Sequence, residues 1–127
     1  LVRGNCALVT GIQGKSDHIR IHGIIDRYLE HSRIFIFANG GDEKMFIGSA
    51  DWMPRNLDNR VEVITPVYDS RIKEDLWKVI DFGLRGNCQG SVVDGSGKNC
   101  LWTTDTEESF RSQEELYKYY KSHITND

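Results

Sequence analysis

The hydrophobic pattern in the first half of the chain alternates with a period of two, which is typical of β-strands. Because successive side chains on a strand point to opposite faces, such a segment can bury one face and expose the other. The alternation predicts strands over residues 1–9, 18–25, 31–38, 44–52 and 61–67. A cluster of turn residues, Asn39 to Asp42, separates the third strand from the fourth, so we expect these two to form a β-hairpin.

The second half of the chain changes to a helical period. Residues 68–84 carry an apolar stripe at helical spacing, with Asp69 or Ser70 as a candidate cap and Gly86 just past the expected end. Ser112 and Glu115 have the spacing of a capping box, which predicts a second and shorter helix. With strands and helices but no repeat or linker, the sequence predicts a single α/β domain over residues 1–127.

The stretch between the two predicted helices is weakly patterned. Apolar pairs at residues 92–93 and 101–102 flank a turn signal at residues 94–97, which predicts a small hairpin. Asp94 in this turn lacks the further acidic ligands of a calcium loop. We therefore expect a turn and no metal site here.

Composition narrows the class of protein. The formal net charge is −3, from 16 Lys and Arg against 19 Asp and Glu, which argues against nonspecific binding of nucleic acid. The 3 cysteines have no CxxC spacing, so neither a disulfide framework nor a zinc ribbon is expected. No apolar run reaches the roughly 20 residues of a membrane span, and no leader peptide opens the chain. These features predict a cytoplasmic protein without a transmembrane segment.

Candidate chemistry is concentrated on the predicted hairpin. His31 and Arg33 lie two residues apart on one strand and therefore share a face, while Ser49 and Asp51 lie at the matching end of the partner strand. A guanidinium is a fork of fixed charge, and an imidazole can donate, accept or be attacked, so the pair can bind phosphate oxygens. The hairpin therefore predicts a phosphate-binding site, although a lone histidine at the start of a strand is usually an ordinary surface residue.

The same residues resemble the half-motif of the phospholipase D superfamily. The matching positions are His31-x-Arg33, Gly48-Ser49-Ala50-Asp51, Arg55-Asn56 and Glu62-Val63. Two positions depart from that pattern, because Arg33 stands where the superfamily has lysine and Ala38 where it has aspartate. These departures argue against phosphodiester cleavage.

A closer resemblance is to the C-terminal domain of polyphosphate kinase, an enzyme that moves the ATP γ-phosphate onto a polyphosphate chain. It is carried by LVRGNCALV at residues 1–9, by DRYLEHSRIFIFANGGDEKMFIGSADWMPRNLDNRVEVITPV at residues 26–67, and by the helix that follows. It covers roughly the first two-thirds of the chain, and the sequence after Arg85 shows no further match. The resemblance implies a phospholipase D-like fold, with a mixed β-sheet flanked by helices.

The resemblance also implies which residues bind the nucleotide. In polyphosphate kinases the matching histidine and an arginine of the first strand contact the nucleotide phosphates. His31 and Arg3 are therefore the implied pair, with His31 in a supporting catalytic role. Secondary candidates are Arg33, Arg55 and Arg60, for which structural ion pairs with Asp51, Asp58 or Glu62 are the alternative.

The chemistry of the family needs more than this chain. In polyphosphate kinases catalysis passes through a phosphohistidine on a neighbouring phospholipase D-like domain. This chain has no second histidine motif and no initiator methionine, so we expect a fragment that is inactive alone, with the nucleophile upstream of Leu1. The implied ligands are ATP or ADP with Mg²⁺ and inorganic polyphosphate, and we identify no metal ligand in the chain. The implied partners are the remaining domains of the same enzyme and further copies in a homo-oligomer, in the cytoplasm or peripheral to the membrane.

Two further motifs and two other functions are alternatives to this interpretation. Residues 11–16 end like a P-loop, but Val9 stands where that motif needs its first glycine, and a strand-like segment follows instead of a helix. His18 and His22 have a spacing that suits zinc on a helix, but they lie in a predicted strand with no third ligand nearby. The alternative functions are half of a phospholipase D-type phosphodiesterase or transferase, and a non-catalytic polyphosphate-binding module.

Overall fold

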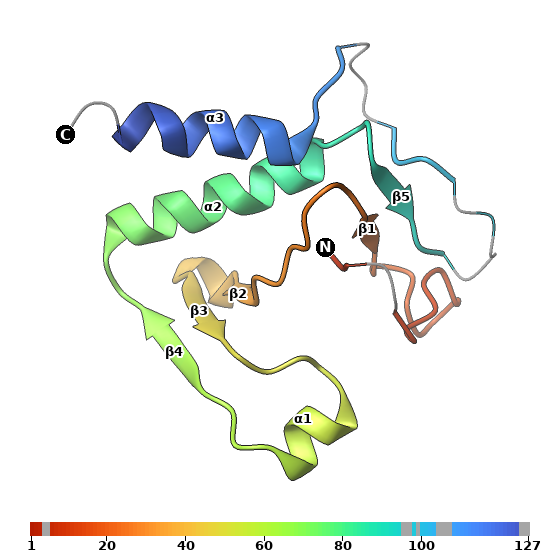
Figure 1. Cartoon of the computed structure of the whole chain (residues 1–127). Coiled ribbons are helices and arrows are strands. Elements are labelled where there is room, and N and C mark those ends of the chain that lie inside the picture. The colour runs from red at the N-terminus through yellow and green to blue at the C-terminus, as the bar shows by residue number, and fades with distance from the viewer. Residues whose placement is uncertain (4–5, 95–97, 99, 104–107, 125–127) are drawn as a thin grey trace. The chain divides into compact units, whose positions relative to one another are not determined.

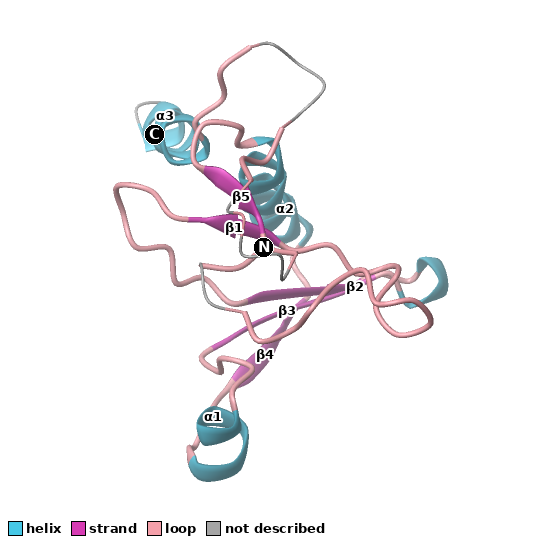
Figure 2. Ribbon diagram, turned by 90° about the vertical axis from the view of Figure 1, so that its right-hand side faces the viewer, coloured by secondary structure: helices cyan, strands magenta, loops and turns pink. Residues whose placement is uncertain are grey.

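The computed structural model describes residues 1–3, 6–94, 98, 100–103 and 108–124. The chain falls into two compact units, of which the first comprises Leu1–Glu30 with Lys78–Asp127 and the second comprises His31–Trp77. Each unit contains one small antiparallel sheet (Figure 1, Figure 2). The α/β class is thus confirmed, but the described residues form two antiparallel sheets in place of the single mixed sheet that we expected.

The sheet of the second unit has the strand order β2 (Ile34–Phe37), β3 (Lys44–Gly48) and β4 (Ile64–Val67). A short 3-10 turn, Asn39–Gly41, joins β2 to β3, as the turn cluster predicts. All three turn residues have positive φ angles, and two of them are glycines, which adopt that conformation without strain. Met45 in the central strand pairs with Ile36 and Val67 and is 1% exposed, so the small core of this unit lies here.

A short helix, α1 (Pro54–Asn59), lies between β3 and β4 and was not predicted. Pro54 occupies its first turn, where a missing N–H group has no cost, and this is the local signal for the helix. Asn56 is the buried residue of α1, with 2% of its surface exposed. The helix therefore carries a polar side chain into the interior of the second unit.

The sheet of the first unit pairs β1 (His22–Ile24) with β5 (Gly90–Val92). The helix α2 (Ser70–Arg85) begins in the second unit and ends in the first, and α3 (Ser112–Ile124) follows later in the chain; both helices were predicted. Phe82 of α2 makes edge-to-face contacts with Phe110 and Tyr119, which pack the end of α2 against α3. None of the helices in the described residues is long and apolar enough to cross a membrane.

The predicted strand over residues 1–9 is wrong. Among the described residues of that segment, Val2 alone joins a sheet, through a parallel bridge to Gly23, and residues 6–9 form no strand. The predicted strand over residues 18–25 is reduced to β1. Alternation shows that a segment could bury one face, but a strand also needs a neighbour along its length, and these segments have one only near β1.

Two further predictions concern loops. The hairpin predicted around residues 94–97 is supported by an antiparallel bridge between Ser91 and Leu101, while its turn at residues 95–97 lies outside the described residues. The P-loop-like segment at residues 11–16 is a turn, in which the Ser16 hydroxyl donates to the Val9 carbonyl at 2.9 Å and accepts from the Ile12 N–H at 2.9 Å. The Ser16 hydroxyl therefore stabilises this turn, which agrees with the prediction that residues 11–16 are not a P-loop.

Candidate functional site

His31, Arg33 and Asp51 form a cluster of polar side chains at one end of the β2–β3 hairpin. The Arg33 Nε donates to Asp51 Oδ1 at 3.0 Å, and its Nη2 lies 2.7 Å from the Nε2 of His31. The Gly48 N–H donates to the Arg33 carbonyl, which extends the strand pairing to the base of the cluster. The predicted proximity of His31 and Arg33 is therefore confirmed by a direct contact, although both residues precede β2 and do not lie in a strand.

The hydrogen bonds fix the proton on the imidazole in this arrangement. A guanidinium can only donate, so the Nε2 of His31 accepts from Arg33 and the ring carries its proton on Nδ1. The side chain of His31 is 47% exposed and Asp51 lies 3.6 Å from its Nε2. A proton on Nε2 would remove the lone pair that accepts from Arg33, so this hydrogen bond requires the neutral ring.

The net charge of the cluster is small. Asp51 offsets the positive charge of Arg33, to which it is hydrogen bonded, and His31 adds a charge only when it is protonated. Phosphate binding needs an excess of positive charge and several donors. The cluster can orient a phosphate oxygen, but a strong phosphate site would need a further cation.

A second network lies beside the cluster and was missed by sequence reasoning. The Ser49 hydroxyl donates to Glu62 Oε2 at 2.5 Å, and the buried Asn56 donates to Glu62 Oε1 at 2.8 Å. These two bonds, followed by the positive charges of Arg60 and Arg33, hold the pKa of Glu62 below its usual value. The three residues belong to the motif positions noted above, but only the folding of α1 brings Asn56 to the carboxylate.

The secondary candidates lie in different environments. Arg33 forms an ion pair with Asp51, which is the alternative to a binding role that the sequence indicates for this residue. Arg55 lies in the first turn of α1 and Arg60 just after the end of that helix, and both are exposed. No ion pair of either arginine is found among the described residues, which leaves both guanidinium groups available to an anion.

Arg3 is exposed and belongs to the first unit, next to Val2. Hydrogen bonds of 2.8 Å and 2.9 Å tie the Val2 backbone to His22 and Ile24, so the residue before Arg3 is anchored to β1. The pairing of Arg3 with His31, which belongs to the second unit, stays a prediction that rests on the resemblance.

The described residues contain no group of three His, Cys, Asp or Glu side chains that could hold a metal ion. His22, one of the two histidines with zinc-like spacing, is 3% exposed and stacks on Trp102, with ring centroids 4.3 Å apart. It is a core residue of the first unit, whereas His18 is exposed.

Comparison with known proteins identifies the family. The model of the polyphosphate kinase C-terminal domain 2 matches residues 1–113. The chain belongs to the polyphosphate kinase family. It is 43% identical over 122 residues to the polyphosphate kinase of Escherichia coli (strain K12), covering 96% of this chain and 18% of that protein. It is 40% identical over 122 residues to the polyphosphate kinase of Vibrio vulnificus (strain YJ016), covering 96% of this chain and 17% of that protein.

The structural comparison agrees. The crystal structure of polyphosphate kinase from Porphyromonas gingivalis matches with a TM-score of 0.90 and 39% identity, covering 100% of this chain and 19% of that one. The chain therefore spans about a fifth of the length of these polyphosphate kinases. The similarity continues past Arg85, so our expectation that it ends in the first two-thirds of the chain was wrong. The later residues supply β5 and α3, which complete the first unit.

Proposed function

We propose that this chain is part of a polyphosphate kinase that reversibly transfers the ATP γ-phosphate to a polyphosphate chain. The observation that carries the proposal is the family match over residues 1–113, together with relatives of 40–43% identity that are polyphosphate kinases. In this proposal the phosphohistidine belongs to a neighbouring domain of the same enzyme. The chain contributes residues that bind the nucleotide phosphates.

The proposed role of His31 and Arg3 is to neutralise phosphate charge as the γ-phosphoryl group moves. Such transfers depend mainly on positioning and on positive charge that is already in place. The ion pair with Asp51 leaves little net charge on the His31 cluster, so a second cation must come from elsewhere. Arg3 is the candidate that the family resemblance implies, and Arg55 and Arg60 are exposed arginines that could add to it.

The proposed metal is the Mg²⁺ of the ATP complex. Magnesium is usually bound through substrate phosphates and water with few protein ligands. In this proposal Arg3 and His31 contact phosphate oxygens that the ion leaves uncovered. The remaining domains of the enzyme and further copies in a homo-oligomer are the proposed protein partners, with a cytoplasmic or membrane-peripheral location.

Substitution in the full-length enzyme tests this role. We expect His31→Ala and Arg3→Ala each to reduce ATP-dependent polyphosphate synthesis by at least about tenfold, because one charge-assisted contact contributes about 1.5–3 kcal/mol. Synthesis is measured as transfer of labelled γ-phosphate into polymer. His18→Ala and Arg20→Ala are matched controls, since both side chains are exposed and lie outside the proposed site. Near-normal synthesis by His31→Ala or Arg3→Ala would rule out the proposed role.

A further inference from the structure

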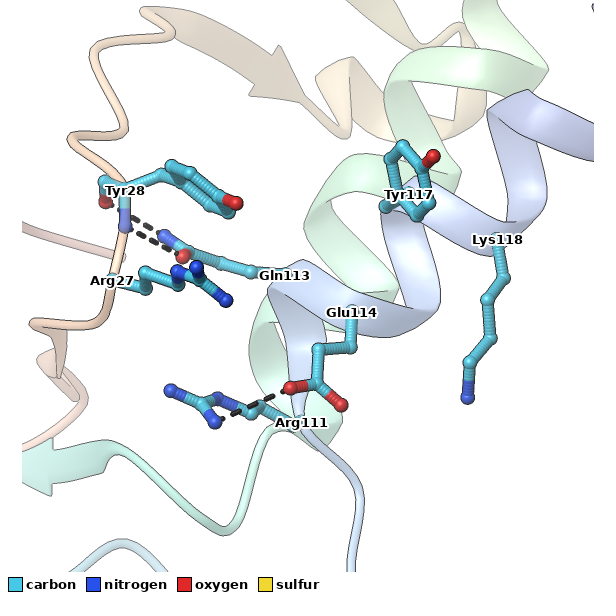
Figure 3. Close-up of a pocket in the computed structure, with 7 residues that line it drawn as sticks. All are labelled: Arg27, Tyr28, Arg111, Gln113, Glu114, Tyr117 and Lys118. Atoms are coloured by element: carbon cyan, nitrogen blue, oxygen red, sulfur yellow. Dashed lines mark hydrogen bonds and ion pairs between the residues drawn. The ribbon is translucent and has the colours of Figure 1, made fainter.

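The first unit contains a pocket that the proposed function does not use. It has a volume of about 620 Å³ and lies between the segment that follows β1 and the first two turns of α3. Its wall is formed mainly by rings and aliphatic stems, and Figure 3 shows the lining residues, Arg27, Tyr28, Arg111, Gln113, Glu114, Tyr117 and Lys118. An apolar pocket with a few convergent polar groups is the usual form of a small-molecule site.

Two side chains give the pocket a fixed shape. The amide of Gln113 accepts from the Tyr28 N–H at 2.9 Å and donates to the Tyr28 carbonyl at 2.8 Å, as a neighbouring strand would (Figure 3). Arg111 binds Asp26 through Nη2 at 2.6 Å and through Nε at 3.1–3.2 Å, and the Asp26 side chain is 2% exposed. Both contacts tie the start of α3 to the segment after β1, so the wall is formed before any ligand binds.

The charges around the pocket are almost all paired. Arg111 is held by Asp26 and by Glu114 at 3.2 Å, and Lys118 is held by Glu115 at 2.6 Å. Arg27 differs, because its guanidinium makes no ion pair with any residue in the described ranges and lies over the Tyr28 ring, 5.5 Å from the centroid. The pocket therefore offers one available positive charge, which suits a single negative group and not a polyanion.

The aromatic rings supply the other part of the site. Tyr28 is 64% exposed and Tyr117 is 65% exposed, although both line a pocket of mostly apolar character. Figure 3 shows the Tyr28 side chain extending towards α3, which carries Tyr117. Exposed tyrosine rings beside an unpaired guanidinium can stack against a planar ring and bind its anionic substituent.

We propose that this pocket binds a planar aromatic anion, with the ring against Tyr28 or Tyr117 and a single phosphate or carboxylate on Arg27. A nucleoside monophosphate is a member of this class and gives a direct probe. The site is separate from the role proposed for His31 and Arg3, and it does not depend on that role.

Photolabelling of the full-length enzyme with 8-azidoadenosine 5′-monophosphate tests the proposal. After digestion, mass spectrometry should find the label on the peptides that contain Tyr28 or Tyr117. Competition should be at least about tenfold stronger with AMP than with adenosine or inorganic phosphate, because the site uses both the ring and the charge. Because His31 lies three residues after Tyr28, fragment-ion sequencing of the labelled peptide is used to distinguish label on Tyr28 from label on His31.

Substitutions decide whether the named groups bind the probe. Arg27→Gln should lower the labelling of these peptides at least about tenfold, and Tyr117→Leu should lower the labelling of the Tyr28 peptide at least about fivefold. Both side chains are exposed, so both variants should fold; Arg20→Gln is the matched control and should label normally. Three results would overturn the proposal: no label on either peptide, unchanged labelling of Arg27→Gln, or competition by phosphate equal to that by AMP.

Discussion

At the scale of single residues, His22 is the most constrained side chain of the first unit. It is 3% exposed and stacks on Trp102 with an interplanar angle of 12°, and neither ring nitrogen has a hydrogen-bond partner among the residues that the structure describes. A Cβ atom at Gly90 of the neighbouring strand β5 would lie 2.1 Å from the Nε2 of His22, so residue 90 must be glycine. Burial lowers the pKa of His22 from 6.5 to about 4.

This burial predicts a pH-dependent stability. Because the pKa of His22 is about 4 in the folded chain and near 6.5 when unfolded, the unfolded state binds the proton first. The free energy of unfolding should therefore fall as the pH drops from 6.5 to 4, by up to about 3 kcal/mol. Denaturant titrations at a series of pH values measure this free energy. In His22→Leu, the free energy of unfolding should depend less steeply on pH over that range. An identical slope in the wild type and in His22→Leu would contradict the prediction.

At the scale of elements, α3 is tied to the rest of the first unit by a few polar contacts that are distant in sequence. Arg111 precedes the helix and binds the buried Asp26, while Gln113 in the first turn pairs with the Tyr28 backbone. The hydrogen bonds from Arg111, more than its charge, hold the pKa of Asp26 below the usual value of 3.8. These contacts hold the start of α3 in place, and Phe82 packs on its later turns through Tyr119.

Removal of the Asp26 charge should loosen this connection. We expect Asp26→Asn to lower the free energy of unfolding by about 1–3 kcal/mol at neutral pH, since charge-assisted hydrogen bonds are lost. The pKa of Asp26 is lowered in the folded chain, so its contribution is complete above about pH 4 and is lost as the pH falls through the folded value. The wild type and the variant should therefore converge in acid.

Asp81→Asn is the matched control for this experiment. Asp81 pairs with Arg85 on the surface of α2 at 3.4 Å, and exposed pairs of this kind contribute little to stability. If Asp26→Asn were no less stable than Asp81→Asn at neutral pH, Asp26 would not be the connection that we describe.

The elements differ in how far the sequence could predict them. The helix α2 and the turn at Asn39–Gly41 depend on local spacing and turn chemistry, and both were predicted. The strand expected over residues 1–9 failed because alternation says nothing about a partner strand, and α1 was missed because its six residues carry little periodicity. Within the site, parity alone predicted that His31 lies beside Arg33, whereas the contact of Asn56 with Glu62 needed the fold of α1.

At the scale of the whole molecule, the chain is a small part of the enzyme that we propose. It spans about a fifth of the polyphosphate kinases that it matches, and its backbone agrees with the solved one at a TM-score of 0.90. In the proposed function, the small net charge of the His31 cluster means that this hairpin alone would not be sufficient to bind the nucleotide phosphates. In our account, nucleotide binding requires Arg3 from the first unit together with His31 from the second.

The affinity of the full-length enzyme for ATP tests this account most directly. Equilibrium dialysis with Mg²⁺ and labelled ATP, without polyphosphate, measures Kd apart from the chemical step. We predict that Kd rises at least about tenfold in His31→Ala and in Arg3→Ala, because each variant loses a charge-assisted phosphate contact, and stays unchanged in His18→Ala and Arg20→Ala. A Kd within about twofold of the wild type in both His31→Ala and Arg3→Ala would contradict the account.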